Sequence, residues 1–451
     1  MRRVGWKPYA AYMLFLCIAL AMAVLSACDD SSSADADEPT ASLQSSNSSS
    51  KKSSSSKKAY PESFKPNDKE YPYANIPRIV IYTENQQKIK DRETEIPAKL
   101  QIWGKKEAES EIFDLTIRGR GNTSWSMPKK SYKIEFVKKQ SMLGMPKDKD
   151  WALIANYADK TLMKNYIAYR LSAALGAYYA PRCEFAELYL NGEYLGVYLL
   201  TETIKMGKNR IDMPKTNDSY IMEFELNPRK NQQIFYTYTY KTDSIGKPFR
   251  VHYPKDASSE VLLTIQEYVE NFERYLKTVE SQKENHIVEW LDVDEYIKHY
   301  WVQEFSKNPD AAGNSSVFFS WEKNGTIKMG PVWDFDLAFG GHSNEKIDVP
   351  EEWYIKTGYY WYSRIFRDDY VNSVQRSFWN ENRTIFVNEL SVVDSVCTVL
   401  NNAALNNFKK WDILQSTEYV FHRHAYKTYA AAVDDLKLWI SKRIQWIEKN
   451  I

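Results

Sequence analysis

The chain has 451 residues, with 60 lysines and arginines against 59 aspartates and glutamates. A charge this balanced excludes a general electrostatic attraction to nucleic acid, and the length allows a large hydrophobic core and more than one subdomain. The positions of the cysteines and histidines match no zinc-site spacing.

The first 27 residues are predicted to be a targeting segment. They begin with basic residues, continue with an almost wholly apolar stretch over residues 10–24, and end in Leu25-Ser26-Ala27-Cys28, which is similar to a bacterial lipobox. We therefore expect cleavage before Cys28 and lipidation of this cysteine. An uncleaved membrane anchor is the alternative, although the apolar run is short for a spanning helix. The sequence thus predicts a lipid-anchored protein of the bacterial cell envelope, facing the periplasm or the surface.

Residues 28–70 follow as a predicted tether. This stretch is rich in serine and poor in large apolar residues, so it cannot bury enough surface to offset the entropy lost on folding. We expect the tether to separate the lipid from a folded part over residues 71–451. Two cysteines remain in that part, Cys183 and Cys397, and the sequence leaves open whether they pair.

The folded part opens with three predicted strands, over 79–83, 99–103 and 113–117. The last strand leads into a glycine turn made of Arg118, Gly119, Arg120, Gly121 and Asn122. Glycine lets backbone N–H groups come close to a phosphate, and the arginines add positive charge. A nucleotide-binding loop is therefore one interpretation of the turn, and an ordinary hairpin is the other.

A strand with alternating polarity follows at 131–136. Tyr132, Ile134 and Phe136 lie on one face, whereas Lys133 lies on the other. A glycine loop followed by a lysine on the next strand is the order found in the N-terminal lobe of protein kinases. We expect Lys133 to contact the nucleotide phosphates, with Lys130 as the second candidate, although either could be a solvated strand lysine.

A helix, a hairpin and an acidic strand come next. Asp159 is the expected N-cap of a helix that stops at Gly176. Strands at 185–190 and 193–201 flank Asn191-Gly192, which favours a type I′ hairpin turn. Glu202 ends this hairpin and is either the partner of the lysine or a surface residue. The strand over 220–226 carries Glu223 and Glu225 on one face, as candidates for contact with a ribose or the lysine.

Helical patterns dominate from Ser258 onward. Apolar stripes predict amphipathic helices near 262–276 and 433–451, and both stripes are expected to face the core. A third helix begins after Asp292, with Glu295 at the capping-box position, and ends near Ser306. The aromatic stretch 355–366 could line a substrate surface, but nothing in the sequence proves it.

The stretch after this third helix organises the chain. Residues 308–314 form a polar loop with Asp310 and Asn314, and residues 317–332 form a predicted hairpin that ends at Asp334 and Asp336. If the two aspartates are extended, they point to opposite faces, so one of them would hold most of a metal ion. Aspartates that cap turns at an ordinary strand end are the alternative.

The order of these groups matches protein kinases, which present a catalytic aspartate, a metal-binding asparagine and then a metal-binding aspartate. Here the hairpin is longer, and no His-Arg pair precedes Asp310. With these residues, the chain resembles the CotH kinase family from about Ile76 to the C-terminus. The resemblance rests on several separate stretches: Arg118–Trp125, Lys129–Lys133, Asp150–Thr161 and the segment from Asp310 to Asp334.

The resemblance implies an α+β, atypical two-lobed kinase-like fold, with a β-rich part over about 76–225 and a helical part over about 226–451. It also implies transfer of the ATP γ-phosphoryl group, with Mg²⁺ or Mn²⁺, to hydroxyls of a protein substrate. Asp310 would accept the proton, and the metal would lie with Asn314, Asp334 and Asp336. The alternatives are a catalytically silent surface protein of the same fold and, less well supported, a carbohydrate-active enzyme with paired carboxylates.

Overall fold

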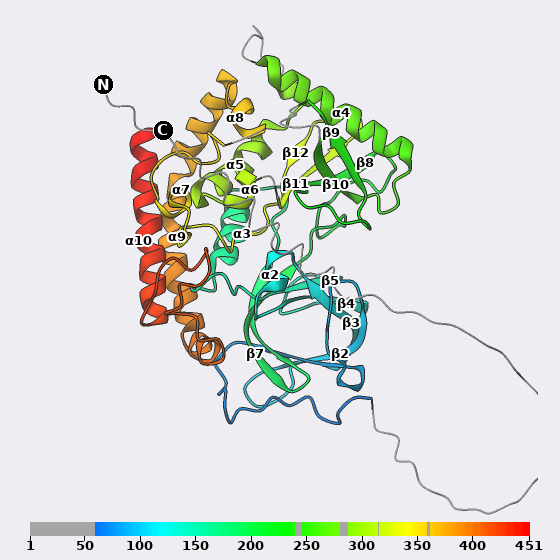
Figure 1. Cartoon of the computed structure of the whole chain (residues 1–451), viewed down its shortest axis with the longest axis vertical. Coiled ribbons are helices and arrows are strands. Elements are labelled where there is room, and N and C mark those ends of the chain that lie inside the picture. The colour runs from blue at the N-terminus through cyan, green and yellow to red at the C-terminus, as the bar shows by residue number, and fades with distance from the viewer. Residues whose placement is uncertain (1–58, 240–245, 280–286, 314, 359–360) are drawn as a thin grey trace, which may run out of the picture. The chain divides into compact units, whose positions relative to one another are not determined.

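The computed structural model describes residues 59–239, 246–279, 287–313, 315–358 and 361–451. The earlier part of this region is rich in strands and contains a closed barrel, whereas the later part is mainly helical (Figure 1). The predicted α+β class, with a β-rich N-terminal region and a helical C-terminal part, is therefore confirmed.

Seven strands form the barrel. In chain order they are β1 (Arg78–Thr83), β2 (Ile96–Trp103), β3 (Phe113–Arg120), β4 (Ser131–Gln140), β5 (Asp148–Ile154), β6 (Cys183–Leu190) and β7 (Glu193–Glu202). The spatial order is β1-β2-β3-β4-β5-β7-β6, and a parallel pairing of β1 with β6 closes the barrel. The other pairings are antiparallel, which short hairpins can connect.

The barrel strands follow the alternation of polar and apolar residues in the sequence. Every second residue of β2 is buried, and Leu100, Ile117 and Ile134 are fully enclosed in the interior. Between β6 and β7, Asn191 and Gly192 both have positive φ, at 52° and 81°. These angles confirm the predicted hairpin, because a type I′ turn needs two left-handed residues.

A second sheet has the order β12-β11-β8-β10-β9. Its strands are β8 (Ser219–Phe224), β9 (Ile234–Thr237), β10 (Lys247–Tyr253), β11 (Val317–Glu322) and β12 (Lys328–Met329). β8 lies between β10 and β11, so a strand from the end of the predicted N-terminal part belongs to a sheet of the later chain. The return strand expected to reach Val332 stops at Met329, because Gly330 takes φ of 112° and leaves the sheet.

The helices are α2 (Thr123–Ser126), α3 (Lys164–Ala174), α4 (Ser259–Thr278), α5 (Val293–Ser306), α6 (Pro309–Gly313), α7 (Glu345–Asp348), α8 (Trp361–Ile365), α9 (Asp369–Lys410) and α10 (Tyr429–Asn450), with 3₁₀ turns at Glu84–Gln86 and Ile287–Glu289. The predicted helices α3, α4, α5 and α10 are confirmed. The 42-residue α9 was not predicted. It lies along α10, as Figure 1 shows, and also contacts α3, α5 and β7.

The start of α3 differs from the prediction. Met163 occupies the N-cap position, whereas the Asp159 carboxylate accepts hydrogen bonds from the N–H groups of Thr161 and Lys164 from farther back in the chain. Asp159 therefore still satisfies the first N–H of the helix, although it is not the capping residue. The helix ends before Gly176, whose φ of 76° agrees with the predicted stop.

Candidate active site

Helix α5 leads directly to Asp310, and hydrogen bonds at both ends of the helix define where it starts and stops. The Asp292 carboxylate accepts a hydrogen bond from the Glu295 N–H at 3.1 Å, which confirms the predicted N-cap. Glu295 does not complete a capping box, because its carboxylate binds the backbone N–H of Tyr178 and the Lys298 side chain. The helix ends at Lys307, and residues 309–313 then form α6 rather than the expected irregular loop. Asp310 lies in the first turn of α6.

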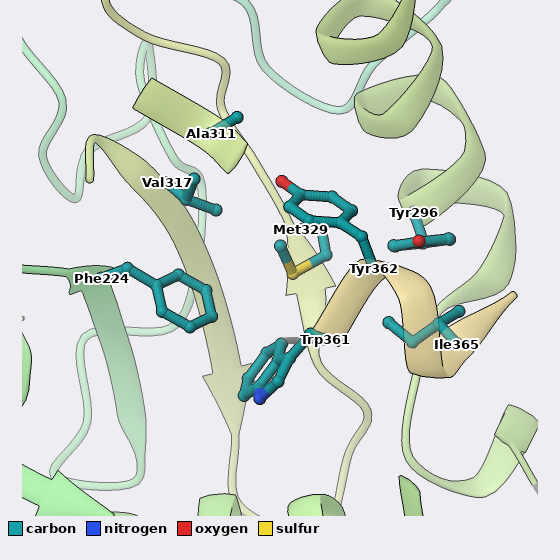
Figure 2. Close-up of a pocket in the computed structure, with 8 residues that line it drawn as sticks. All are labelled: Phe224, Tyr296, Ala311, Val317, Met329, Trp361, Tyr362 and Ile365. Carbon is teal, nitrogen blue, oxygen red and sulfur yellow. The ribbon is translucent and has the colours of Figure 1, made fainter. Parts of the chain in front are cut away.

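Helix α6 packs against an apolar pocket through Ala311. Figure 2 shows Ala311 of α6 together with side chains from β8, β11 and β12 of the second sheet and from α8. The lining residues are Phe224, Tyr296, Ala311, Val317, Met329, Trp361, Tyr362 and Ile365. The packing leaves no room for a water molecule, so this pocket supports the fold rather than binding a ligand.

The same pocket corrects the prediction for the aromatic stretch 355–366. Trp361 and Tyr362 are 2% and 4% exposed, and they belong to the core beneath the second sheet. They therefore cannot line a substrate surface. Tyr359 and Tyr360 lie outside the described residues.

The backbone at Asp334 is left-handed rather than extended. Its φ is 67°, a region that residues other than glycine seldom adopt. As a result Asp334 and Asp336 do not point to opposite faces, as the sequence suggested. Their carboxyl groups share a hydrogen bond, which requires that one of the two carries a proton.

Three carboxyl groups, Asp310, Asp334 and Asp336, form what we call the aspartate cluster. Burial and the charge of Asp334 raise the pKa of Asp310 to about 8. Burial also raises the pKa of Asp334, against the opposing charge of Arg120. The pKa of Asp336 is raised well above its usual value by burial and then by the two other aspartates. The structure thus brings together the predicted acids of α6 and of the later turn.

Arg120 is the positively charged residue that most strongly lowers the pKa of Asp334, which burial raises. Its guanidinium lies over the Trp333 ring at 4.8 Å from the centroid, and Trp333 stacks on Tyr169 of α3 at 5.6 Å. Burial lowers the pKa of Arg120, while Asp334, Tyr169 and Glu223 act in the opposite direction. The barrel strand β3 therefore delivers one positive charge to the aspartate cluster.

The other residues of the predicted glycine turn have structural contacts. Arg118, Gly119 and Arg120 belong to β3, so the turn itself starts at Gly121, with φ of 97°. A Cβ on Gly119 would lie 2.3 Å from the Trp125 ring, which explains this glycine by packing. Arg118 donates to the Arg92 carbonyl at 2.6 Å.

The Asn122 side chain accepts hydrogen bonds from Arg92 and Arg229, at 3.1 Å and 2.7 Å. The turn is therefore tied both to the β1–β2 connection and to the segment that follows β8. Asn122 remains a predicted binding residue, and these contacts fix where it lies.

Lys133 and Glu202 are not paired with each other. The Lys133 ammonium lies 2.8 Å from Glu135 and 2.9 Å from Asp150. Glu202 is fully buried and binds Arg210, Arg182 at 3.0 Å and the Tyr179 hydroxyl at 3.0 Å. The interpretation of Glu202 as the partner of the lysine is therefore wrong, and two arginines take that place.

Lys130, the second candidate, donates to the Trp125 carbonyl at 2.6 Å. This contact holds it against α2. The phosphate contacts of Lys133 and Lys130 remain predictions, and neither lysine is among the groups that act most strongly on the pKa values of the aspartate cluster.

Glu223 joins the neighbourhood of Asp334 from β8. Its carboxylate lies 2.7 Å from His252 Nε2 and 3.9 Å from Arg250, both on β10. Its charge acts on Asp334 and on Arg120. Glu225 accepts a hydrogen bond from the Asn227 N–H at 3.1 Å, and burial raises its pKa.

Comparison with known proteins identifies the family. The sequence model of the family described as CotH kinase protein matches residues 117–447, which is more than half of the chain. The chain belongs to the CotH kinase family. The match includes every member of the aspartate cluster, and it begins within β3, after β1 and β2.

A curated relative supports this assignment. The inner spore coat protein H of Bacillus subtilis (strain 168) is 23% identical over 255 residues, covering 54% of this chain and 62% of the relative. The match thus spans less than two thirds of the relative's length.

A divalent metal fits the donor set of the aspartate cluster, although the site is not a complete cage. Among the described residues, no three His, Cys, Asp or Glu side chains are grouped to hold a metal ion by themselves. Mg²⁺ usually takes only one or two carboxylates and completes its shell with water and phosphate oxygens. Burial, and then the neighbouring aspartates, raise the pKa values of Asp310 and Asp336, and a bound cation would favour their ionised forms. Asn314, the predicted amide ligand, lies outside the described residues.

The predicted lipid anchor and tether lie almost entirely outside the part of the chain that the structure describes. Cys28, the targeting segment and most of the tether lie outside the described residues. None of the helices that are described combines the length and hydropathy needed to cross a membrane. The structure contains no disulfide between Cys183 and Cys397.

Sequence reasoning missed several polar residues that hold the aspartate cluster. Ser316 donates to Asp334 Oδ2 at 3.3 Å, and Lys164 donates to the Gly340 carbonyl at 2.9 Å. Asn165, Tyr169 and Asn308 bind the backbone around Asp334. Lys164, Asn165 and Tyr169 come from α3, far from Asp334 in the sequence, so no local spacing could have indicated them.

Proposed function

We propose that this CotH kinase is an atypical protein kinase that transfers the γ-phosphoryl group of ATP to a serine or threonine hydroxyl of a protein. The observation that carries the proposal is the aspartate cluster: carboxyl groups from α6 and from the Asp334 turn lie close enough to raise one another's pKa values. Phosphoryl transfer passes through a loose transition state, so positioned charges matter more than covalent chemistry.

Each group has a proposed role. Asp310 orients the substrate hydroxyl and accepts its proton, for which a pKa of about 8 is well matched to neutral conditions. Asp334, together with Asn314, holds the metal, and Asp336 supports Asp334 through their shared hydrogen bond. When bound, the divalent ion neutralises phosphate charge.

Arg120 and the neighbouring turn are the proposed phosphate contacts. Arg120 already opposes the charge of Asp334, so it is placed to stabilise the negative charge that develops during transfer. The Gly121-Asn122 backbone would contact the phosphates beside it. Glu223 and Glu225 are proposed to contact the ribose from the end of β8.

A lipid anchor on Cys28 would place this activity in the bacterial cell envelope, where ATP is scarce. This location keeps a second function in consideration: a catalytically silent surface protein with the same fold. The engagement of Lys133 by two acids favours that second function, because a kinase needs cations that are available to phosphate. The proximity of Asp310 and Asp334, shown by the effect of the Asp334 charge on the pKa of Asp310, favours the kinase.

The deciding experiment incubates protein beginning at Tyr60 with ATP and Mg²⁺ and measures added phosphate by mass spectrometry. Phosphate that appears with the wild type and disappears with Asp334→Ala supports transfer. A silent binding protein would show no added phosphate and no thermal stabilisation that depends on both nucleotide and metal.

A further inference from the structure

One buried side chain connects the two segments of the aspartate cluster. Asn308 is 1% exposed, and its Oδ1 accepts a hydrogen bond from the Asp310 N–H at 3.1 Å. Its Nδ2 donates to the Asp334 carbonyl at 3.1 Å and to Gln303 Oε1 at 2.9 Å. An N–H donor on one side and two acceptors on the other define which way the amide faces. The Asn308 side chain therefore satisfies α6 and the Asp334 turn at the same time.

Ending α5 does not require this side chain. The Lys307 N–H donates to the Glu304 carbonyl, and the Asn308 N–H donates to the Gln303 carbonyl, both at 3.1 Å. Lys307 has φ of 50°, which turns the chain out of the helix. Backbone groups thus close the last turn of α5, and the amide of Asn308 is left to bind the two functional segments.

From the opposite side, helix α3 holds the Asp334 turn. Asn165 Oδ1 accepts a hydrogen bond from the Phe335 N–H at 2.7 Å, and the Tyr169 hydroxyl oxygen accepts one from the Asp334 N–H at 3.5 Å. Asn165 is 1% exposed and is itself bound to Asn156 at 3.1 Å. The turn therefore keeps two hydrogen bonds to α3 that do not involve Asn308.

We propose that Asn308 is a positioning residue for the phosphoryl transfer proposed above: it sets the separation between the proton acceptor Asp310 and the metal-binding Asp334. Asn308 joins the backbones of α6 and of the Asp334 turn directly. Because α3 fixes the Asp334 turn independently, loss of the amide frees α6 relative to the turn. The inference depends on the proposed function for its catalytic consequence but not for the structural link.

The test compares Asn308→Ala and Asn308→Asp with a matched control, Asn407→Ala. Asn407 is also 1% exposed and also joins two elements, since it accepts hydrogen bonds from Lys129 Nζ at 2.9 Å and from the Val197 N–H at 3.1 Å. It has no contact with the aspartate cluster. Asn308→Asp keeps the acceptor for the Asp310 N–H but places an oxygen against the Asp334 carbonyl.

We expect Asn308→Ala to lower kcat by about 100-fold, the size of effect that a misplacement of about 1 Å produces. The KM for ATP should stay within about 3-fold, since the contacts with nucleotide are unchanged. Asn308→Asp should also lose kcat, and Asn407→Ala should lower the melting temperature while the folded protein keeps its kcat. A folded Asn308→Ala protein with wild-type kcat would overturn the proposal.

Hydrogen exchange measured by mass spectrometry tests the link without activity. Asn308→Ala should speed exchange in a peptide covering 309–316, where the Asp310 N–H loses its acceptor, whereas the segment 333–338, which α3 holds, should change less. Asn407→Ala should leave both segments unchanged. Exchange in 309–316 as slow as in the wild type would contradict the link. If the wild type transfers no phosphate, the proposed function fails, and the exchange result alone decides whether Asn308 joins the two segments.

Discussion

The barrel and the aspartate cluster both contain buried acids, but the two regions treat them differently. In the barrel, Glu202 is surrounded by Arg182, Arg210 and the Tyr179 hydroxyl, so its charge is balanced within the fold. In the aspartate cluster, three carboxyl groups face mainly Arg120 and Lys164, and their pKa values rise.

This difference separates acids that stabilise the structure from acids that are available to a ligand. A buried charge needs a partner, and an acid that has none inside the protein either keeps a proton or binds a cation from outside. Perturbed acids that gather in one place therefore indicate a functional site better than a single ion pair does. The aspartate cluster meets this criterion and Glu202 does not.

The largest expected effect is the loss of activity in Asp334→Ala. Phosphate transfer should fall by at least about 10³-fold, since an electrostatic group at the reacting centre is removed. The fold should survive, because the half-buried carboxylate adds little to the core. Radiolabelled phosphate transfer and circular dichroism measure the two outcomes. Asp394→Ala, on the exposed side of α9, is the control and should behave as wild type.

Glu202→Gln should show the opposite behaviour. It leaves the fully buried Arg210 without its closest carboxylate, so the free energy of unfolding should drop by about 3 kcal/mol. The protein that remains folded should keep its activity. Urea unfolding provides the measurement, and Glu95→Gln, in an exposed pair with Arg118, should cost less than about 1 kcal/mol. A clear loss of activity in folded Glu202→Gln protein would refute the distinction between structural and functional acids.

Two cations can be compared directly. Arg120→Gln should lower phosphate transfer by about 100-fold, because it removes the charge that opposes Asp334. Lys133→Met should change transfer by less than about 3-fold, since Glu135 and Asp150 already occupy the ammonium group. Steady-state kinetics on both variants measures the two effects. A larger loss in Lys133→Met than in Arg120→Gln would show that Lys133, rather than Arg120, contacts the phosphates.

The smallest expected effect is on stability as a function of pH. In metal-free protein the pKa of Asp310 is about 8, above the value of about 3.9 for an unfolded aspartate. The folded state therefore binds the proton more tightly, and the stability that this confers is complete below about pH 4 and is lost as pH rises through about 8.

Urea unfolding in the presence of EDTA, from about pH 5 to about pH 8, measures this trend. The slope should stay below about 1.4 kcal/mol per pH unit for this one group. Asp310→Asn should reduce the decline. Stability that increases over this range would show that the aspartate cluster is ionised in the folded protein.

Local patterns predicted much of the fold. Alternation located the first barrel strands, Asn191-Gly192 predicted the hairpin, and Asp292 predicted the start of α5. Each of these features depends on residues that are close in sequence. The prediction missed α9, whose buried residues are spaced among polar ones over 42 residues. It also missed the pairing of β8 with β11, which depends on contacts between distant segments.

The candidate site was predicted by residue type but not by geometry. Asp310 and Asp334 were expected to lie together, and the structure brings them together. The left-handed φ of Asp334 was not foreseen, because the surrounding hydrogen bonds come from α3 and from the end of α5. Glu202 was misassigned, since its arginine partners lie on segments that carry no pattern linking them to it.

The length of α9 limits how far the protein can be shortened. This helix contacts β7, α3, α5 and α10, and its Asn407 accepts a hydrogen bond from the buried Lys129 ammonium of the barrel. Deleting α9 would expose the face of β7 that it covers and would leave the Lys129 ammonium without its side-chain acceptor. Recombinant material for crystallisation or inhibitor screening should therefore retain the chain through Asn450 and carry any affinity tag beyond residue 451.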